Sequence, residues 1–275
     1  SGGRGEVGSR FGRFCAHDLY GSNVTDHGYA AVSRACEALG WPELRVVERT
    51  GSTNDDLIGG GSHGQVLLAL EQTAGRGRLD RTWVSAPGDG LTFSVRLEVP
   101  ATVRAWGWIP LLAGVAVADA VRATGAQGVG VKWPNDVVAG DGKLAGILSI
   151  RDGSAAVVGI GINLAFAGDL PDPQAVSVEQ AGGVVDADSL LAAVVANLGA
   201  WWQRFVDAGG DAQRSGLQEA YAGQCVSVGV DVTVAAPDRT WSGFAEGIDH
   251  DGRLLVRDGE VRAVSAGDVT LRRSR

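Results

Sequence analysis

Residues 75–83 place glycines and arginines together in one short segment, Gly-Arg-Gly-Arg-Leu-Asp-Arg-Thr-Trp. Glycine lets the backbone approach a bound molecule closely, and the planar arginine guanidinium donates to carboxylate or phosphate oxygens. The segment, which we expect to be mobile, could therefore close over an anion, or it could be a solvated surface loop. Asp80 stands where a dinucleotide fingerprint would need its third glycine, and no GxxxxGK[ST] pattern occurs. Both of those phosphate-binding motifs are therefore excluded.

A second group of chemically active residues, Lys132-Trp133-Pro134-Asn135-Asp136, is expected where a strand ends and a hairpin begins. Strand ends commonly present reactive side chains. Lys132 could balance phosphate charge and Asp136 could hold Mg²⁺, although an ion pair at a surface turn has the same pattern. Lys143 either protects a sheet edge or points into a pocket shared with Arg76 and Arg78.

The elements that must position these residues alternate between helices and strands up to about residue 220. Apolar periodicity and capping residues predict helices over 29–39, from the cap cluster 52–56 to before Gly59, over 109–124, and from a cap at Asp188. Strands are expected over 44–48, 66–71, 91–99 with one buried face, 129–133, 137–138, 144–150 and 155–162.

From Val226 onward, short alternating strands with turns at 236–238, 249–252 and 258–259 predict a small β-barrel. The fold class is therefore α+β, with a mixed β-sheet and helices followed by that barrel. We predict an N-terminal extension over 1–24 that is not part of the folded domains, a catalytic domain over 25–220 and a barrel domain over 221–275.

Composition narrows the function classes. The net charge of −8 over 275 residues argues against a broad basic surface for nucleic acid. Three scattered cysteines and four histidines have no zinc or disulfide spacing, and no apolar stretch is long enough for a membrane span. A reducing cytoplasm is the simplest compartment.

Five motifs in this order and spacing resemble the signature of biotin–protein ligases. They are Gly51–Asn54, Glu71–Arg78 with Trp83, Lys132–Asp136, Gly142–Leu148 and Gly159–Asn163, and residues 264–269 resemble the closing barrel of that family. The resemblance implies a class II synthetase-like catalytic domain and an SH3-like C-terminal barrel. It also implies that ATP and Mg²⁺ activate biotin as biotinyl-5′-AMP, which a lysine of a biotin carboxyl carrier domain then attacks.

The same resemblance implies roles for individual residues. Catalysis falls to Arg78, Lys132 and Lys143. Biotin would be bound by Ser52, Thr53, Gln72, Gly75, Arg76, Lys143 and Gly146. The nucleotide would be bound by Arg78, Arg81, Trp83, Lys132, Asn135 and Asn163, and Mg²⁺ by Asp136. Residues 75–83 would become ordered when ligand binds, and Leu79-Asp80, where many members have Arg-Gly, implies slower ordering or weaker retention.

Three alternative functions are weighed against this one. A lipoate–protein ligase uses related chemistry, but the 75–83 segment and the terminal barrel favour biotin. A non-catalytic module is disfavoured because all four cationic residues of the motifs are present. A DNA-binding repressor is disfavoured because the stretch before Val46 is short for a winged helix. We therefore expect a monofunctional ligase without nucleic-acid or membrane partners, as a monomer or an edge-to-edge homodimer.

Overall fold

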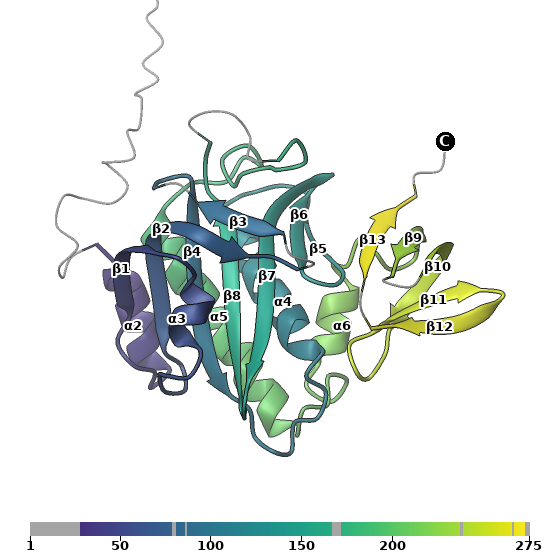
Figure 1. Ribbon diagram of the computed structural model, residues 1–275, viewed down its shortest axis with the longest axis horizontal. Helices are drawn as coiled ribbons and strands as arrows, with labels where there is room; N and C mark the ends of the chain where they lie inside the picture. Colours follow the sequence, from purple (N-terminus) through teal and green to yellow (C-terminus); the bar gives the residue numbers. More distant parts are fainter. Residues whose placement is uncertain are drawn as a thin grey trace, which may run out of the picture.

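The computed structural model describes residues 28–78, 81–85, 87–166, 172–236, 239–265 and 267–272. Two β-sheets organise these residues: a large sheet flanked by helices, and a small antiparallel sheet built by the C-terminal part of the chain (Figure 1). This arrangement confirms the predicted α+β class. Leu79, Asp80 and the predicted extension 1–24 lie outside the described residues.

The large sheet is mixed, as predicted. Its main path runs β1-β2-β4-β8-β7-β6-β5, and β3 pairs with β2 off this path. Only β1 and β2 run parallel among the described pairings; the other pairs are antiparallel. The strands are β1 Arg45–Thr50, β2 Val66–Arg76, β3 Thr82–Ser85, β4 Gly90–Glu98, β5 Val129–Lys132, β6 Asp136–Ala139, β7 Gly142–Asp152 and β8 Ala155–Asn163.

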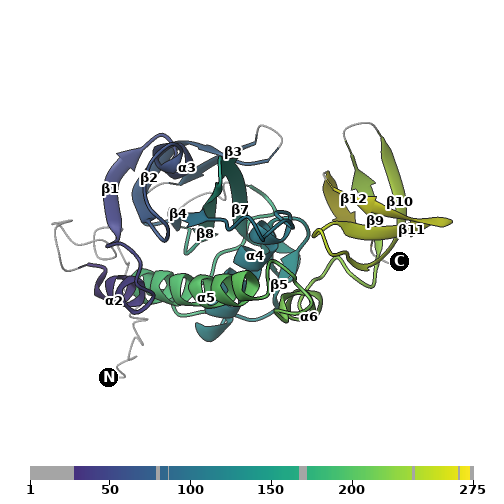
Figure 2. The ribbon, with the colours of Figure 1, turned by 90° about the horizontal axis from the view of Figure 1, so that it is seen from below.

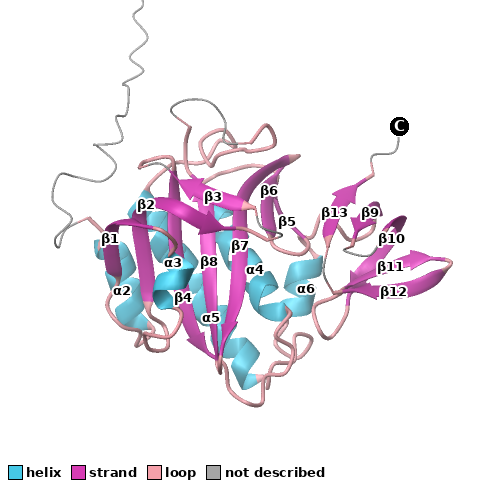
Figure 3. Cartoon of the chain, viewed as in Figure 1, coloured by secondary structure: helices cyan, strands magenta, loops and turns pink. Residues whose placement is uncertain are grey.

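Helices cover both faces of this sheet (Figures 2 and 3). One face is covered by α4 Trp108–Ala123 and α5 Ala187–Asp207, which pack on each other, and α2 Ala30–Ala38 packs on α5. The short α3 Thr53–Leu57 lies on the opposite face, against β2, β4 and β8. Consequently β4 is buried on both faces, and the prediction of one buried face was wrong because α3 covers the other.

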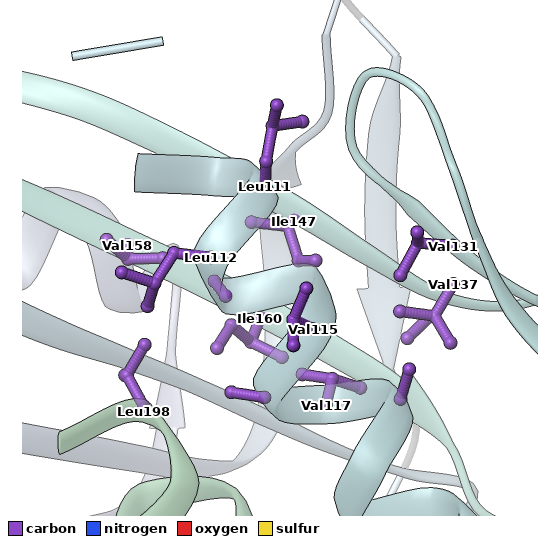
Figure 4. Packing of buried hydrophobic residues seen from close by; sticks show 14 of the residues in the cluster. Leu111, Leu112, Val115, Val117, Val131, Val137, Ile147, Val158, Ile160 and Leu198 are labelled. Carbon is purple, nitrogen blue, oxygen red and sulfur yellow. The ribbon is translucent and has the colours of Figure 1, made fainter. Parts of the chain in front are cut away.

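The core lies between α4 and the sheet. Leu112 and Val115 of α4 meet Ile147, Val158 and Ile160 of β7 and β8, and all five are at most 2% exposed (Figure 4). Most residues of α4 are buried because the helix packs against both the sheet and α5. No described helix combines the length and the apolar character needed to cross a membrane.

The long helix α5 begins two residues earlier than predicted. Its N-cap is Asp186, whose extended backbone lets the carboxylate accept the Ser189 N–H at 3.0 Å. The predicted cap, Asp188, lies inside the first turn. Its carboxylate instead accepts the backbone N–H groups of Ala31 and Val32, at 2.9 and 3.0 Å, and so ties the start of α2 to α5.

The glycine–arginine segment is more regular than expected for a mobile loop. Strand β2 continues through Arg76, and β3 pairs back on it, with Gly75 opposite Trp83 and Arg76 opposite Thr82. Both ends of the segment are therefore held in a hairpin.

The C-terminal sheet has the order β12-β11-β10-β9-β13, and every described pairing in it is antiparallel. Its strands are β9 Asp231–Ala235, β10 Thr240–Ile248, β11 Leu254–Asp258, β12 Glu260–Val264 and β13 Asp268–Leu271. The sheet is SH3-like but open, because within the described residues its end strands β12 and β13 do not pair. The predicted small SH3-like barrel is therefore present as an open sheet of five strands.

Side chains of the first domain fix the position of this small sheet. The Trp133 indole donates to the Gly252 carbonyl at 3.0 Å, and the Trp108 indole donates to the carbonyls of Asp249 and His250. The short helix α6 Leu217–Ala222, which the sequence did not predict, packs on α4. The turn at 249–252 thus joins the small sheet to the first domain by accepting hydrogen bonds from Trp108 and Trp133.

Candidate active site

A pocket of about 720 Å³ lies on the face of the large sheet that carries α3. The start of α3, the β2–β3 hairpin, the β5–β6 turn, β7, β8 and the start of β13 all contribute to its walls. All residues predicted for the site line it except Gly75. Those that do are Ser52, Thr53, Gln72, Arg76, Arg78, Arg81, Trp83, Lys132, Asn135, Asp136, Lys143, Gly146 and Asn163.

Gly75 lies directly behind the pocket wall. A Cβ at this position would fall 1.9 Å from Nε2 of Gln72 and 2.2 Å from the Trp83 carbonyl oxygen. The absence of a side chain at Gly75 therefore lets the Gln72 side chain pass over this position, so that its amide donates to the Trp83 carbonyl of β3 at 3.3 Å.

One end of the pocket is a buried polar network at the N-terminus of α3. Ser52 caps the helix by accepting the Asp55 N–H. The Thr53 N–H donates to Oε1 of Gln72 at 2.9 Å, and the Thr53 hydroxyl lies 3.2 Å from the same oxygen. These contacts fix hydroxyl and amide groups where a polar ring could exchange hydrogen bonds with them.

Two members of this network were not predicted as site residues. The Ser94 hydroxyl lies 2.7 Å from both the Thr53 hydroxyl and Oδ1 of Asn54, and the Asn54 amide donates to the Leu148 carbonyl. Asn54 belongs to the same motif as Ser52 and Thr53, and this was the signal in the sequence that could have identified it as a site residue. Ser94 is one of the alternating polar residues of β4, a pattern that indicated a solvent-exposed face and gave no signal of a site.

The other end of the pocket is cationic. Nζ of Lys143 lies 2.7 Å from Oδ1 of Asp136 and 5.9 Å from the centre of the Trp83 ring. Lys143 therefore points into the pocket and does not simply protect a sheet edge. Lys132 lines the same pocket, and these two are the only lysines in the sequence.

Arginines of the hairpin complete this end, and the C-terminal sheet meets them there. Arg78 donates to the Gly267 carbonyl at 3.4 Å, and Arg81 forms an ion pair with Asp268. Burial lowers the pKa of Arg78 from its ordinary value, while Asp268 and Asp136 act in the opposite direction. Arg76 lies 3.1 Å from Asp55 on α3. The contribution of Asp268 could not be predicted, since it comes from a different sheet.

Trp83 lies against a floor of glycines. A Cβ on Gly161 would be 2.2 Å from the indole, and one on Gly146 would be 3.2 Å from it. Side chains at either position would move the indole. The glycines of two separate motifs therefore make room for one aromatic ring.

The two predicted asparagines brace the pocket wall. The Asn163 amide donates to the carbonyls of Lys143 and Val176, at 3.2 and 3.1 Å, and the Asn135 amide donates to the Ile147 carbonyl at 3.0 Å. The segment after Asp172 also holds the lysine, because the Lys143 N–H donates to the Gln174 carbonyl at 2.6 Å. Asn163 thereby fixes the backbone that carries Lys143.

The described residues of this pocket suit a metal ion that is held jointly by one carboxylate and by a bound nucleotide. Among the described residues, the group with metal-ligand spacing is Asp249-His250-Asp251, which does not line the pocket, and Arg253 already pairs with both of its carboxylates. Asp136 offers the pocket one carboxylate, partly engaged by Lys143. Mg²⁺ commonly uses one or two carboxylates together with substrate phosphates, so Asp136 suits an ion that arrives with a nucleotide.

Comparisons with known proteins agree with this geometry. The chain matches the Biotin/lipoate A/B protein ligase family over residues 46–166 and the Biotin protein ligase C terminal domain over residues 228–272. It is 38% identical over 242 residues to the Biotin--[acetyl-CoA-carboxylase] ligase of Mycobacterium tuberculosis, covering 84% of this chain and 89% of that one. Identity to the protein of the same name from Paracoccus denitrificans is 35%, covering 80% and 96%. The solved biotin protein ligase from Aquifex aeolicus in complex with biotin and ATP is similar with a TM-score of 0.72 at 27% identity, covering 84% and 99%.

Proposed function

The chain belongs to the biotin protein ligase family, and from this premise we propose how its pocket performs the ligation. A carboxylate oxygen of biotin attacks the α-phosphorus of ATP, which forms biotinyl-5′-AMP and releases pyrophosphate. The ε-amine of an acceptor lysine then attacks the acyl carbon, so that an amide forms, AMP leaves and a proton is lost. The acceptor is a biotin carboxyl carrier domain.

One observation carries the proposal: a single pocket joins a buried polar network to a cluster of cations. The network of Thr53, Gln72 and Ser94 offers paired donors and acceptors, as a ureido ring requires. At the other end, Lys143 and Arg78 can neutralise the charge that rises when a carboxylate approaches a triphosphate. One pocket thus offers a site for a polar ring and a site for an anionic tail.

We assign the residues accordingly. Biotin contacts Ser52, Thr53, Gln72, Arg76, Lys143 and Gly146, and Gly75 makes room for Gln72. The nucleotide contacts Arg78, Arg81, Trp83, Lys132, Asn135 and Asn163. Lys143 meets the biotin carboxylate, and Arg78 meets the phosphate of the adenylate. Mg²⁺ held by Asp136 would supply further neutralisation of phosphate charge.

Water must be kept from the acyl-adenylate, since hydrolysis would waste it. The β2–β3 hairpin supports this role because Arg78 and Arg81 already reach across to β13. We propose that residues 75–83 close fully over the ligand only after it binds. The part over 25–220 then supplies the chemistry, and the part over 221–275 supports the hairpin.

The experiment is to incubate the protein with biotin, ATP, Mg²⁺ and the carrier domain of an acetyl-CoA carboxylase, and to measure the intact mass of that domain. A mass increase of one biotinyl group, lost when the acceptor lysine is replaced by arginine, is expected. Modification only when lipoate replaces biotin would move the protein to the lipoate ligases. No modification with either acid would contradict the proposal.

We also propose that this cytoplasmic ligase acts without a nucleic-acid partner, in keeping with its net charge of −8. An electrophoretic mobility-shift assay with the promoter regions of biotin-synthesis genes, with and without biotinyl-5′-AMP, should show no shifted band. A sequence-specific shift that depends on the adenylate would contradict this.

A further inference from the structure

Thr92 on β4 carries a buried hydroxyl group that has no partner. The residue is 3% exposed and lines the pocket, and its Oγ1 makes no hydrogen bond. The only other pocket-lining side-chain atom in this condition among the described residues is Oδ1 of Asp136, and that oxygen is paired with Lys143. Thr92 thus presents the one wholly unpartnered hydroxyl buried in the described pocket wall.

The surrounding chain explains why no partner is available. Thr92 pairs with Ala69 on β2 and with Gly161 on β8, and neither residue has a polar side-chain atom. Ser94, the next residue of β4 on the same face, already contacts Thr53 and Asn54. Movement of a neighbouring side chain in the same row of the sheet cannot satisfy the hydroxyl. A partner must come from the space of the pocket.

Leaving a hydroxyl buried and unbonded destabilises a protein, because the group has lost its hydrogen bonds to water. A ligand that supplies the missing bond recovers this loss on binding. Thr92 lies between the two ends of the pocket. It is two residues from Ser94 of the polar network along β4, about 7 Å, and on the other side its row continues through Gly161 to Gly146, beside Lys143 and Trp83. A ring bound by the polar network can therefore extend to the Thr92 hydroxyl.

We propose that the Thr92 hydroxyl forms a hydrogen bond with the ureido ring of biotin and helps to select biotin over lipoate. This inference rests on the proposed function. A ureido group offers strong donors and a strong acceptor, whereas a ring sulfur accepts only weakly. Lipoate has sulfur atoms but no ureido group, so it would leave Thr92 unsatisfied. A site built to hydrogen-bond one substrate rejects an analogue that lacks the bonding group.

The test replaces the hydroxyl with a methyl group of similar size, Thr92→Val, and keeps the hydroxyl in the control Thr92→Ser. Biotin affinity is measured by isothermal titration calorimetry, and the melting temperature of each unliganded protein is measured alongside. We expect Thr92→Val to bind biotin about two- to tenfold more weakly and to melt at the same or a higher temperature. Thr92→Ser should bind within about twofold of the parent.

A second ligand identifies the bonded group. Desthiobiotin keeps the ureido ring and lacks the sulfur, so Thr92→Val should weaken its binding by the same factor. A loss seen with biotin but absent with desthiobiotin would overturn the ureido assignment. Unchanged biotin affinity in Thr92→Val would overturn the inference while leaving the proposed function intact. Failure of the parent protein to bind biotin would overturn the proposed function and this inference together.

Discussion

Replacing Lys143 by methionine removes a positive charge from the cationic end of the pocket while keeping a side chain of similar length. At a separation of about 3 Å, Coulomb's law gives about 1.4 kcal/mol between unit charges in water and about 5.5 kcal/mol at an effective dielectric constant of 20. The Lys143 side chain is 35% exposed and lies 2.7 Å from Asp136, so its environment falls between these limits. Adenylation should slow by about 10²- to 10³-fold, the usual loss when a preorganised charge is removed.

The assay is the rate of biotin-dependent exchange of pyrophosphate into ATP at saturating substrates. Arg34→Met removes the same charge from an exposed position on α2 and should exchange at the parental rate. The melting temperature of Lys143→Met shows whether the protein remains folded. A folded Lys143→Met protein with an exchange rate within about threefold of the parent would refute the role that we assign to Lys143.

Three further predictions concern other parts of the structure. Arg78→Gly should release biotinyl-5′-AMP into solution at least about tenfold faster, as a charge-assisted hydrogen bond is lost; retention equal to the parent, measured by rapid filtration, would contradict the assignment. Asn163→Asp replaces the amide NH2 group, which donates to the carbonyls of Lys143 and Val176, by an oxygen that faces both carbonyls. Its free energy of unfolding should therefore fall by about 1–3 kcal/mol and adenylation should slow; parental values in urea melts and exchange assays would speak against that bracing role. Burial lowers the pKa of His63 from 6.5, opposed by the charge of Glu98, and the His63 imidazole accepts the Glu98 N–H. The unfolded chain therefore protonates His63 more readily than the folded protein, so the contribution of His63 to the free energy of unfolding is full above pH 6.5 and is lost as the pH falls below it. A melting temperature that declines equally at low pH in His63→Asn would exclude His63 as the cause.

Local signals in the sequence predicted much of the site. Ser52 followed by acidic residues predicts a helix N-cap, because the serine hydroxyl can accept a free backbone N–H of the first turn, and the structure confirms this cap. The hairpin at 139–142 is confirmed, because its glycines satisfy a turn between two apolar strands. Motif order brought Lys132, Lys143 and the arginines into one hypothesis, and all of them line one pocket.

The failures come from tertiary contacts. The alternation in β4 placed Thr92 and Ser94 on a face that reads as solvent-exposed, yet α3 and the pocket walls bury both. Asp186 and Asp188 are equally good caps by composition, and packing of α2 against α5 decides between them. Asp268 pairs with Arg81 from the far end of the sequence, which no local pattern indicates.

The most direct test of the central claim is pyrophosphate release from ATP and Mg²⁺ in the presence of biotin, lipoate or neither acid, with no carrier domain added. The account predicts release with biotin alone, because the polar network and the cations of one pocket together bind a ureido acid and activate its carboxylate. Release with lipoate alone, or no release by folded protein with biotin, would contradict it.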